Sequence, residues 1–185
     1  MRLLFIDACP RADSRTRRLA ESRIGGFRGE IVRIFLDGEG LTPLSGAELE
    51  RREALIAAGD YSSPCFRYAK EFAAADEIVV CAPYWDLSFP SVLKVFLERV
   101  CVRGVTFSFT ETGEAVGLCR ARRMRYFTTM GAEGLPYDFG YGYVSALCRT
   151  YFGIADTELI TAEGLDLEGR DPEEILKAVA EGLRE

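Results

Sequence analysis

The chain has 185 residues, a length typical of one domain, so residues 1–185 are expected to form a single unit. Apolar residues make up 48% and charged residues 28%, values typical of globular proteins that exclude a disordered or collagen-like chain. With a net charge of −6, the chain lacks the positive potential that nucleic-acid binding needs. No apolar run approaches the roughly 18 residues of a membrane span. We therefore expect a cytoplasmic protein that has neither a nucleic-acid nor a membrane partner.

The cysteines and the missing histidines limit the chemistry further. Six cysteines are scattered along the chain without a C-x-x-C pair, namely Cys9, Cys65, Cys81, Cys101, Cys119 and Cys148. This pattern predicts free thiols in a reducing compartment and disfavours a disulfide framework or a metal site. The sequence has no histidine, which removes the commonest general base and metal ligand. Any reaction must therefore depend on other side chains or on a cofactor.

The first half of the chain alternates short β-rich apolar runs with segments of helical periodicity. The elements expected there are a strand at 2–6, a helix at 16–24, a strand at 31–35, and helices at 47–58 and 64–75. Residues 77–82 read Glu-Ile-Val-Val-Cys-Ala, a continuous apolar run typical of a strand that is buried on both faces of a parallel sheet. This strand is expected at the centre.

The second half continues the alternation. Pro90 stands at the favoured first position of a helix that is expected to run until Gly104. The following elements are a hairpin across 105–118, a strand at 125–129, a glycine-rich loop at 131–142, a helix at 143–151, a strand at 154–161 and a closing helix capped by residues 171–174.

Five strands that alternate with helices predict an α/β, doubly wound, three-layer fold. For this count the common arrangement is flavodoxin-like, a five-stranded parallel sheet of order 2-1-3-4-5, here with a small β-hairpin insertion near 105–118. Ligands bind such sheets beyond the carboxyl ends of the strands, near the point where the strand order reverses. We therefore expect the loops at 9–16, 83–89 and 129–134 to converge on one site.

The first of these loops has the features of an anion site. It joins a strand to the start of a helix, where free backbone N–H groups and the helix dipole attract negative charge. Ser14 and Thr16 add hydroxyl groups. The cationic candidates are Arg11, Arg15 and Arg17. A bound phosphate is expected, and the alternative that Ser14 or Thr16 merely caps the helix stays open.

The same loop also resembles the phosphate loop of low-molecular-weight tyrosine phosphatases and related arsenate reductases. Cys9, Arg15 and Thr16 fit the motif Cys-x5-Arg-Thr, in which a thiolate attacks a phosphoryl group held by arginine. That family places its general acid in an Asp-Pro-Tyr segment. Here the Asp-Pro pair is Asp171-Pro172, which is followed by Glu173 and reads as a helix start. The phosphatase therefore stays the less favoured alternative.

A more extensive resemblance begins at the second loop. Residues 83–90 read Pro-Tyr-Trp-Asp-Leu-Ser-Phe-Pro, and Leu93-Lys94 and Gly104-Val105-Thr106-Phe107 follow them. From Asp76 to about Gly164 the chain resembles the flavodoxin-fold NAD(P)H:quinone oxidoreductase and FMN-dependent NADH-azoreductase family. The resemblance implies a homodimeric enzyme that binds FMN and takes electrons from NADH or NADPH. It also implies ping-pong hydride transfer through flavin N5 to a quinone, azo or nitroaromatic acceptor, without a catalytic side chain.

The resemblance also implies the residues that bind the cofactor. Those expected at the phosphate are Cys9, Ser14, Arg15 and Thr16; those beside the ring are Pro83, Tyr84, Trp85, Asp86 and Leu87; those at its polar edge are Thr129, Met130, Gly131 and Ala132. A flat flavin ring needs apolar or aromatic walls beside polar groups, which these residues supply. Packing in the core or at a dimer contact is the alternative for Trp85. The expected partner surface comprises the helix from Pro90 with Tyr137, Phe139 and Tyr141.

Two positions depart from the family pattern. Asp86 stands where azoreductases usually have asparagine, and its carboxylate would repel an anionic reduced flavin unless it faces solvent. Ala132 stands where the family usually has a second glycine, so Gly134 is the candidate to take the turn. Both departures predict an altered redox potential, an altered substrate or weaker flavin binding. A flavin-binding electron carrier without NAD(P)H turnover is accordingly the second functional hypothesis.

Overall fold

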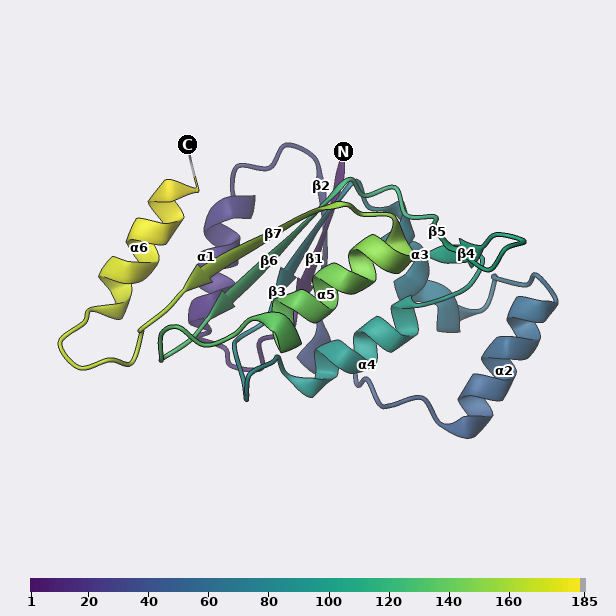
Figure 1. Ribbon diagram of the computed structural model, residues 1–185, viewed down its shortest axis with the longest axis horizontal. Helices are drawn as coiled ribbons and strands as arrows, with labels where there is room; N and C mark the ends of the chain where they lie inside the picture. The colour runs from purple at the N-terminus through teal and green to yellow at the C-terminus, as the bar shows by residue number, and fades with distance from the viewer. Residues whose placement is uncertain (184–185) are drawn as a thin grey trace.

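A computed structural model of the chain describes residues 1–183, and its centre is a five-stranded parallel sheet of order β2-β1-β3-β6-β7 (Figure 1). The strands are β1 (Arg2–Asp7), β2 (Glu30–Phe35), β3 (Glu77–Cys81), β6 (Arg123–Thr129) and β7 (Asp156–Ala162). Numbered along the sheet strands alone, this is the expected order 2-1-3-4-5. The predicted flavodoxin-like arrangement is therefore confirmed.

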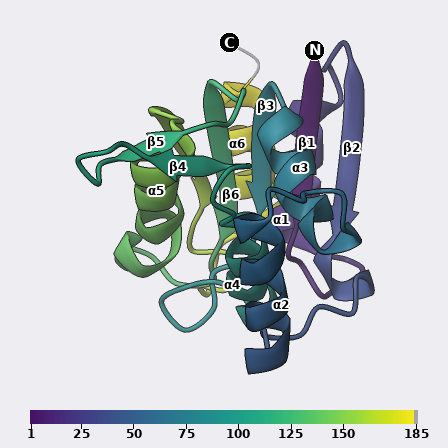
Figure 2. The ribbon, with the colours of Figure 1, turned by 90° about the vertical axis from the view of Figure 1, so that its right-hand side faces the viewer.

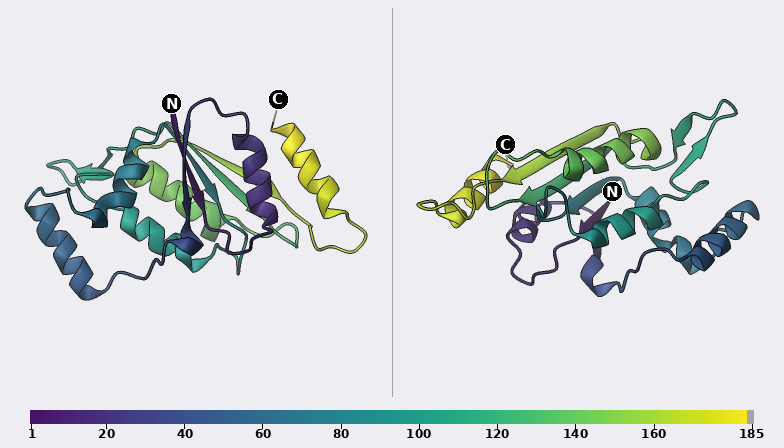
Figure 3. Two further views of the ribbon diagram at one scale, coloured as in Figure 1. Left: turned by 180° about the vertical axis from the view of Figure 1, so that it is seen from behind. Right: turned by 60° about the horizontal axis from the view of Figure 1, so that its bottom comes forward.

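Helices cover both faces of the sheet and complete the three layers. The helices are α1 (Arg15–Ile24), α2 (Gly46–Ala57), α3 (Arg67–Ala74), α4 (Ser91–Val100), α5 (Tyr143–Leu147) and α6 (Pro172–Gly182). One core forms between the sheet and α1 and α6, and another forms between the sheet and α3, α4 and α5 (Figure 3). Helix α2 stands farther from the sheet (Figures 1 and 2). Within residues 1–183 no helix is both long and apolar enough to cross a membrane.

The central strands are buried on both sides because their side chains alternate between the two cores. Leu4 and Ile6 of β1 pack under α3 and α4, whereas Leu3 and Phe5 pack under α1 and α6. In the parallel register Asp7 lies opposite Cys81, so β1 and β3 end at the same edge. The loops that follow these strands therefore start side by side, as the sequence predicts.

The predicted hairpin is also confirmed. Strands β4 (Phe107–Phe109) and β5 (Ala115–Gly117) pair antiparallel and project from the body of the molecule (Figure 3). Gly117 anchors the hairpin against the end of the helical segment that contains α5. A Cβ atom at Gly117 would lie 2.1 Å from the backbone nitrogen of Gly153, so this close approach requires glycine.

Both boundaries of α4 differ from the prediction. Pro90 precedes α4 with an extended ψ of 136°, so the helix begins at Ser91, and it ends at Val100 rather than near Gly104. The buried Thr106 hydroxyl donates to the Val100 carbonyl at 2.8 Å, which closes the turn after the helix.

The glycine-rich loop is also shorter than predicted. Helical backbone begins at Asp138, and wide π-type turns at 138–142 and 148–152 flank α5. The Ser88 hydroxyl donates to the Phe139 carbonyl at 2.8 Å, so a tertiary contact with the second loop stabilises this early helical turn.

Candidate functional site

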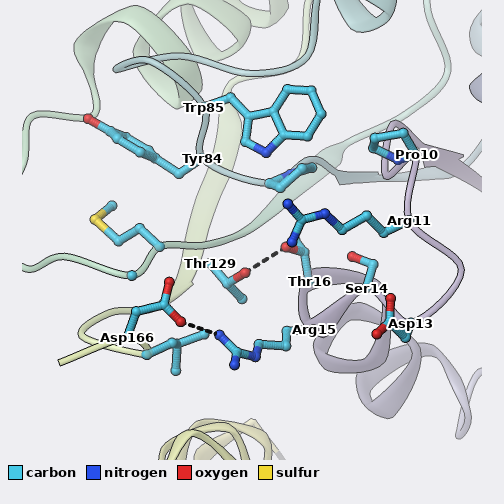
Figure 4. A pocket seen from close by; sticks show the side chains of 14 residues that line it. Pro10, Arg11, Asp13, Ser14, Arg15, Thr16, Tyr84, Trp85, Thr129 and Asp166 are labelled. Carbon is cyan, nitrogen blue, oxygen red and sulfur yellow. Dashed lines mark hydrogen bonds and ion pairs between the residues drawn. The ribbon is translucent and has the colours of Figure 1, made fainter. Parts of the chain in front are cut away.

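A cavity of about 380 Å³ lies at the carboxyl edge of the sheet, where the loops after β1, β3 and β6 meet (Figure 4). This volume suits a small-molecule ligand. The predicted residues that line it are Ser14, Arg15, Thr16, Pro83, Tyr84, Trp85, Thr129, Met130 and Gly131. The predicted residues that do not line it are Cys9, Asp86, Leu87 and Ala132. The convergence of the three loops is therefore confirmed.

The first loop ends at the cap of helix α1. The Ser14 hydroxyl oxygen accepts a hydrogen bond from the Arg17 backbone N–H at 3.2 Å, so Ser14 caps the helix and lines the cavity as well. Thr16 is almost fully buried, and its hydroxyl is 2.7 Å from the Thr129 hydroxyl. This hydrogen bond joins the first loop to the third. The first-turn N–H groups of α1 lie beside these side chains and have no acceptor within the helix.

Arg17 holds the first loop in shape instead of reaching into the cavity. Its guanidinium forms an ion pair with the buried Asp7 carboxylate and donates to the Cys9 carbonyl at 2.7 Å and the Arg11 and Ala12 carbonyls at 2.9 Å. Burial lowers the pKa of Arg17, but the hydrogen bond and charge of Asp7 outweigh it and raise the pKa overall. Of the three candidate cations, Arg11 and Arg15 therefore line the cavity and Arg17 does not.

Cys9 lies beneath the loop. Its side chain is buried, with Sγ 3.3 Å from Cys81 Sγ, and its backbone N–H donates to Asp7 Oδ1 at 2.8 Å. Burial, and then the hydrogen bond that the thiol shares with Cys9, raises the pKa of Cys81 well above its usual range. Arg15 is engaged by Asp166 at 2.7 Å. The phosphatase alternative needs a thiol and an arginine that face the same ligand, and residues 1–183 do not place Cys9 and Arg15 in that way.

The second loop presents Trp85 through a tight two-residue turn. The Trp85 N–H donates to the Ser88 carbonyl at 3.2 Å, and the Ser88 N–H donates to the Trp85 carbonyl at 2.7 Å. Between them Asp86 and Leu87 have φ angles of 50° and 66°, as in the turns that join antiparallel strands. The Trp85 side chain is 41% exposed, so it does not pack in the hydrophobic core, which was one alternative for this residue. Asp86 is exposed and outside the cavity lining.

Tyr84 connects the second loop to the third. Its backbone N–H donates to the Thr129 carbonyl at 3.1 Å, and its hydroxyl donates to the Pro136 carbonyl at 2.8 Å. Burial raises the pKa of the Tyr84 hydroxyl. The phenol is therefore a neutral hydrogen-bond donor at physiological pH, and it fixes one wall of the cavity.

The third loop approaches its neighbours closely at Gly131. A Cβ atom there would lie 2.3 Å from Asp166 Oδ2, so any larger residue would have to move the Asp166 side chain. Within the described part of the chain, Ala132 is not among the residues with positive φ, whereas Gly134 has φ of 68°. The turn has moved to Gly134, as anticipated, and Ala132 is accommodated without backbone strain.

A fourth loop, between β7 and α6, also lines the cavity, although it is not one of the three loops predicted to meet there. Leu165 and Asp166 come from this loop, and the first loop adds Pro10 and Asp13 beside the candidate cation Arg11. Parallel strands place the loops that follow them at one edge of the sheet. Since β7 is parallel to β6, this rule could have predicted that the loop after β7 reaches the cavity.

These side chains suit a ligand with an anionic group at one end and a flat aromatic group at the other. The anion would lie at the start of α1 near Arg11 and Arg15, and the aromatic group would contact Trp85 and Tyr84, which lie above both arginines in Figure 4. The lining includes no histidine, since the chain has none.

Comparison with known proteins relates the whole chain to one family. The model of a family described by its flavodoxin-like fold matches residues 1–185. FMN-dependent NADH:quinone oxidoreductase 2 of Clostridium acetobutylicum is 34% identical over 196 aligned positions, which cover 100% of this chain and 96% of that protein. An FMN-dependent NADH:quinone oxidoreductase of Coprothermobacter proteolyticus is 32% identical, with coverage of 100% and 95%.

Solved structures share the fold. An azoreductase from Bacillus anthracis str. Sterne superposes with a TM-score of 0.83 at 22% identity and covers 99% of this chain and 96% of its own. An FMN-dependent NADH-azoreductase from Bacillus anthracis str. Ames Ancestor, solved in complex with FMN, gives a TM-score of 0.79 at 21% identity, with coverage of 98% and 95%.

Proposed function

The chain belongs to the flavodoxin-like fold family of NAD(P)H:quinone oxidoreductases and FMN-dependent azoreductases, and on this premise we propose that it is an FMN-dependent NADH:quinone oxidoreductase. Residues 1–185 would form a single FMN-binding domain. Relatives at 32% and 34% identity that span nearly the same length and carry this function in their names support the proposal.

The observation that carries the proposal is the composition of the cavity. The end that would bind an anion combines the start of α1 with Arg11, Arg15 and the Ser14 hydroxyl. These groups are the hydrogen-bond donors that a phosphate monoester needs. Its other end offers Trp85, whose exposed surface is available for stacking on a flavin ring. The residues present therefore fit FMN.

In the proposed ping-pong reaction, FMN when bound would supply the redox chemistry that links NADH or NADPH to a second substrate. The protein binds and orients. Arg11 and Arg15 would donate hydrogen bonds to the phosphate, and the tight turn at 85–88 would hold Trp85 beside the ring. The Thr16–Thr129 hydrogen bond keeps the first and third loops at a fixed separation.

The acceptor is proposed to be a quinone, an azo compound or a nitroaromatic compound, since each is a flat molecule that can stack beside an aromatic wall. Next to the second loop lies an apolar hollow of about 530 Å³, whose lining includes Phe89, Phe139 and Tyr143. We propose that a second copy of the chain packs here and completes the acceptor site. The six free cysteines support a reducing, cytoplasmic setting.

The test is a flavin-binding and reduction experiment. The purified protein is mixed with excess FMN and desalted, and its visible absorption spectrum is recorded before and after NADH or NADPH is added without air. A retained flavin band that bleaches, and returns when a quinone is added, is the expected result. Loss of the whole band on desalting would contradict the proposed function.

The second candidate is the flavin-binding electron carrier, and the same experiment separates it. A carrier would retain the band but leave it unchanged with both nicotinamide nucleotides. The exposed Trp85 and the adjoining apolar hollow favour the enzyme, because they leave space for a second flat molecule beside the proposed ring position.

A further inference from the structure

Arg15 is held at the edge of the cavity by a carboxylate from a distant part of the chain. Its Nη1 donates to Asp166 Oδ1 at 2.7 Å, across 151 residues of sequence, and Figure 4 shows the two side chains facing each other. Both residues line the cavity. Since Arg17 is committed to Asp7 and the loop carbonyls, Arg15 and Arg11 are the arginines that a bound anion can use there.

The position of Asp166 is fixed by the loop that carries it. The backbone N–H groups of Gly164, Leu165 and Asp166 donate to the carbonyls of residues 132, 130 and 131 at 2.7, 3.2 and 3.2 Å. The Asp166 side chain also fills the space that a Cβ atom at Gly131 would take. These backbone hydrogen bonds hold the main chain at Asp166 next to the third loop, from where its carboxylate reaches Arg15.

The Arg15–Asp166 ion pair is solvent-accessible, with 41% and 69% of the two side chains exposed. Exposed pairs of this kind are weak, because water screens the charges. A phosphate dianion forms stronger, bidentate hydrogen bonds to arginine, and at the start of α1 it also gains backbone N–H donors. Asp166 engages one nitrogen of the Arg15 guanidinium, so a phosphate at the start of α1 and the Asp166 carboxylate compete for the same positive charge.

We propose that Asp166 is an internal competitor for the phosphate group at Arg15, and that it sets how strongly the cavity prefers a phosphorylated flavin to its dephosphorylated form. The inference rests on the proposed function, in which FMN is the ligand. Formal charges of the lining support it: Arg11 and Arg15 are balanced by Asp13 and Asp166, so neutralising Asp166 leaves one uncompensated positive charge near the phosphate position.

The experiment measures the dissociation constants of FMN and riboflavin, which differ by the phosphate, by fluorescence titration at two salt concentrations. The test variant is Asp166→Asn, whose amide keeps the size of the side chain and an acceptor for Arg15. We expect FMN to bind roughly two- to fivefold more tightly to D166N, with a steeper dependence on salt, because one charge at an exposed site contributes about this much. The riboflavin constant should be unchanged.

Matched variants separate this role from others. Glu168→Gln makes the same change of net charge in an exposed position of the same loop, outside the cavity, and should leave both constants unchanged. In an Arg15→Gln background the gain from D166N should shrink, because the competition for Arg15 is gone. Melting temperatures of all variants check that they are folded.

The outcomes also separate the two proposals. If wild type binds FMN but D166N binds it equally or more weakly, or if E168Q reproduces the gain, the competitor role is wrong and the proposed function stands. An undiminished gain in the R15Q background would also overturn the competitor role. If wild type binds no FMN, the proposed function fails and this inference fails with it.

Discussion

Leu87 has a left-handed backbone conformation that is unfavourable for a residue with a side chain. It has φ of 66° in the second position of the two-residue turn, where glycine is the usual residue. A β-carbon in this region clashes with the following carbonyl, at an energy of about 1–2 kcal/mol. The turn persists because the paired Trp85–Ser88 backbone and the contact of Ser88 with Phe139 hold it from both sides.

Replacing Leu87 with glycine should therefore stabilise the protein. We expect the free energy of unfolding to rise by roughly 0.5–1 kcal/mol in L87G, since the relief of strain outweighs the added entropy of the unfolded chain. Urea denaturation measures this. Leu87→Ala is the control, because alanine shortens the side chain but retains the strain. Equal stabilities of L87A and L87G would show that the turn is not strained.

At the scale of elements, Asp76 connects the starts of neighbouring strands. Its Oδ2 accepts the Arg2 backbone N–H at 2.8 Å, its Oδ1 accepts from Arg120 at 2.7 Å, and its own N–H donates to the Arg2 carbonyl at 2.8 Å. The Arg2 N–H first, and then the charge of Arg120, lower the pKa of Asp76 below its ordinary 3.8. The ionised carboxylate therefore aligns β1, β3 and the segment that leads into β6.

This shift predicts a pH dependence of stability. A carboxyl group whose pKa is lower in the folded state stabilises the fold above its unfolded pKa, and this contribution is lost as pH falls below about 4 through the folded value. In Asp76→Asn we expect lower stability at pH 7 and a shallower loss between pH 4 and pH 2. Urea denaturation across this range measures both, with Glu168→Gln as the charge-matched control. An unchanged slope in D76N would contradict the prediction.

At the scale of the whole molecule, the proposed dimer follows from one exposed apolar region beside the site. Phe139 is 63% exposed and lines the apolar hollow together with Phe89 and Tyr143. Exposed hydrophobic patches mark surfaces that bind another chain or a ligand, and we propose a second copy of this chain here. The proposed acceptor site would then have one wall from each copy.

Substitution of Phe139 by glutamate should therefore convert the dimer to a monomer. The introduced charge would be buried without a partner in the interface, which strongly disfavours association. Light scattering coupled to size-exclusion chromatography gives the mass of the particle. Phe35→Glu is the matched control, because Phe35 is 45% exposed and lies outside this hollow. A monomeric wild type, or a dimeric F139E, would refute the proposed interface.

Much of the fold was predictable, because the signals that specify it are local. The run at 77–82 indicates a strand buried on both faces, and β3 indeed lies between β1 and β6. The boundaries that were wrong depend on tertiary contacts. Helix α4 ends at Val100, whose carbonyl accepts a hydrogen bond from the Thr106 hydroxyl. The helical segment at 138 begins early because the Ser88 hydroxyl donates to the Phe139 carbonyl. Neither contact leaves a signature in the local sequence.

The sequence by itself determined the order of strands and helices, and thereby the edge at which the site lies, since parallel strands place the loops that follow them at one end. It also determined the residue types available there. Tertiary structure alone decided which of them face the cavity: Arg17 is drawn to the buried Asp7, Cys9 is packed against Cys81, and Asp166 reaches Arg15 across 151 residues. These pairings depend on how the loops pack on one another, and hydrophobic periodicity and turn propensity carry no information about that packing.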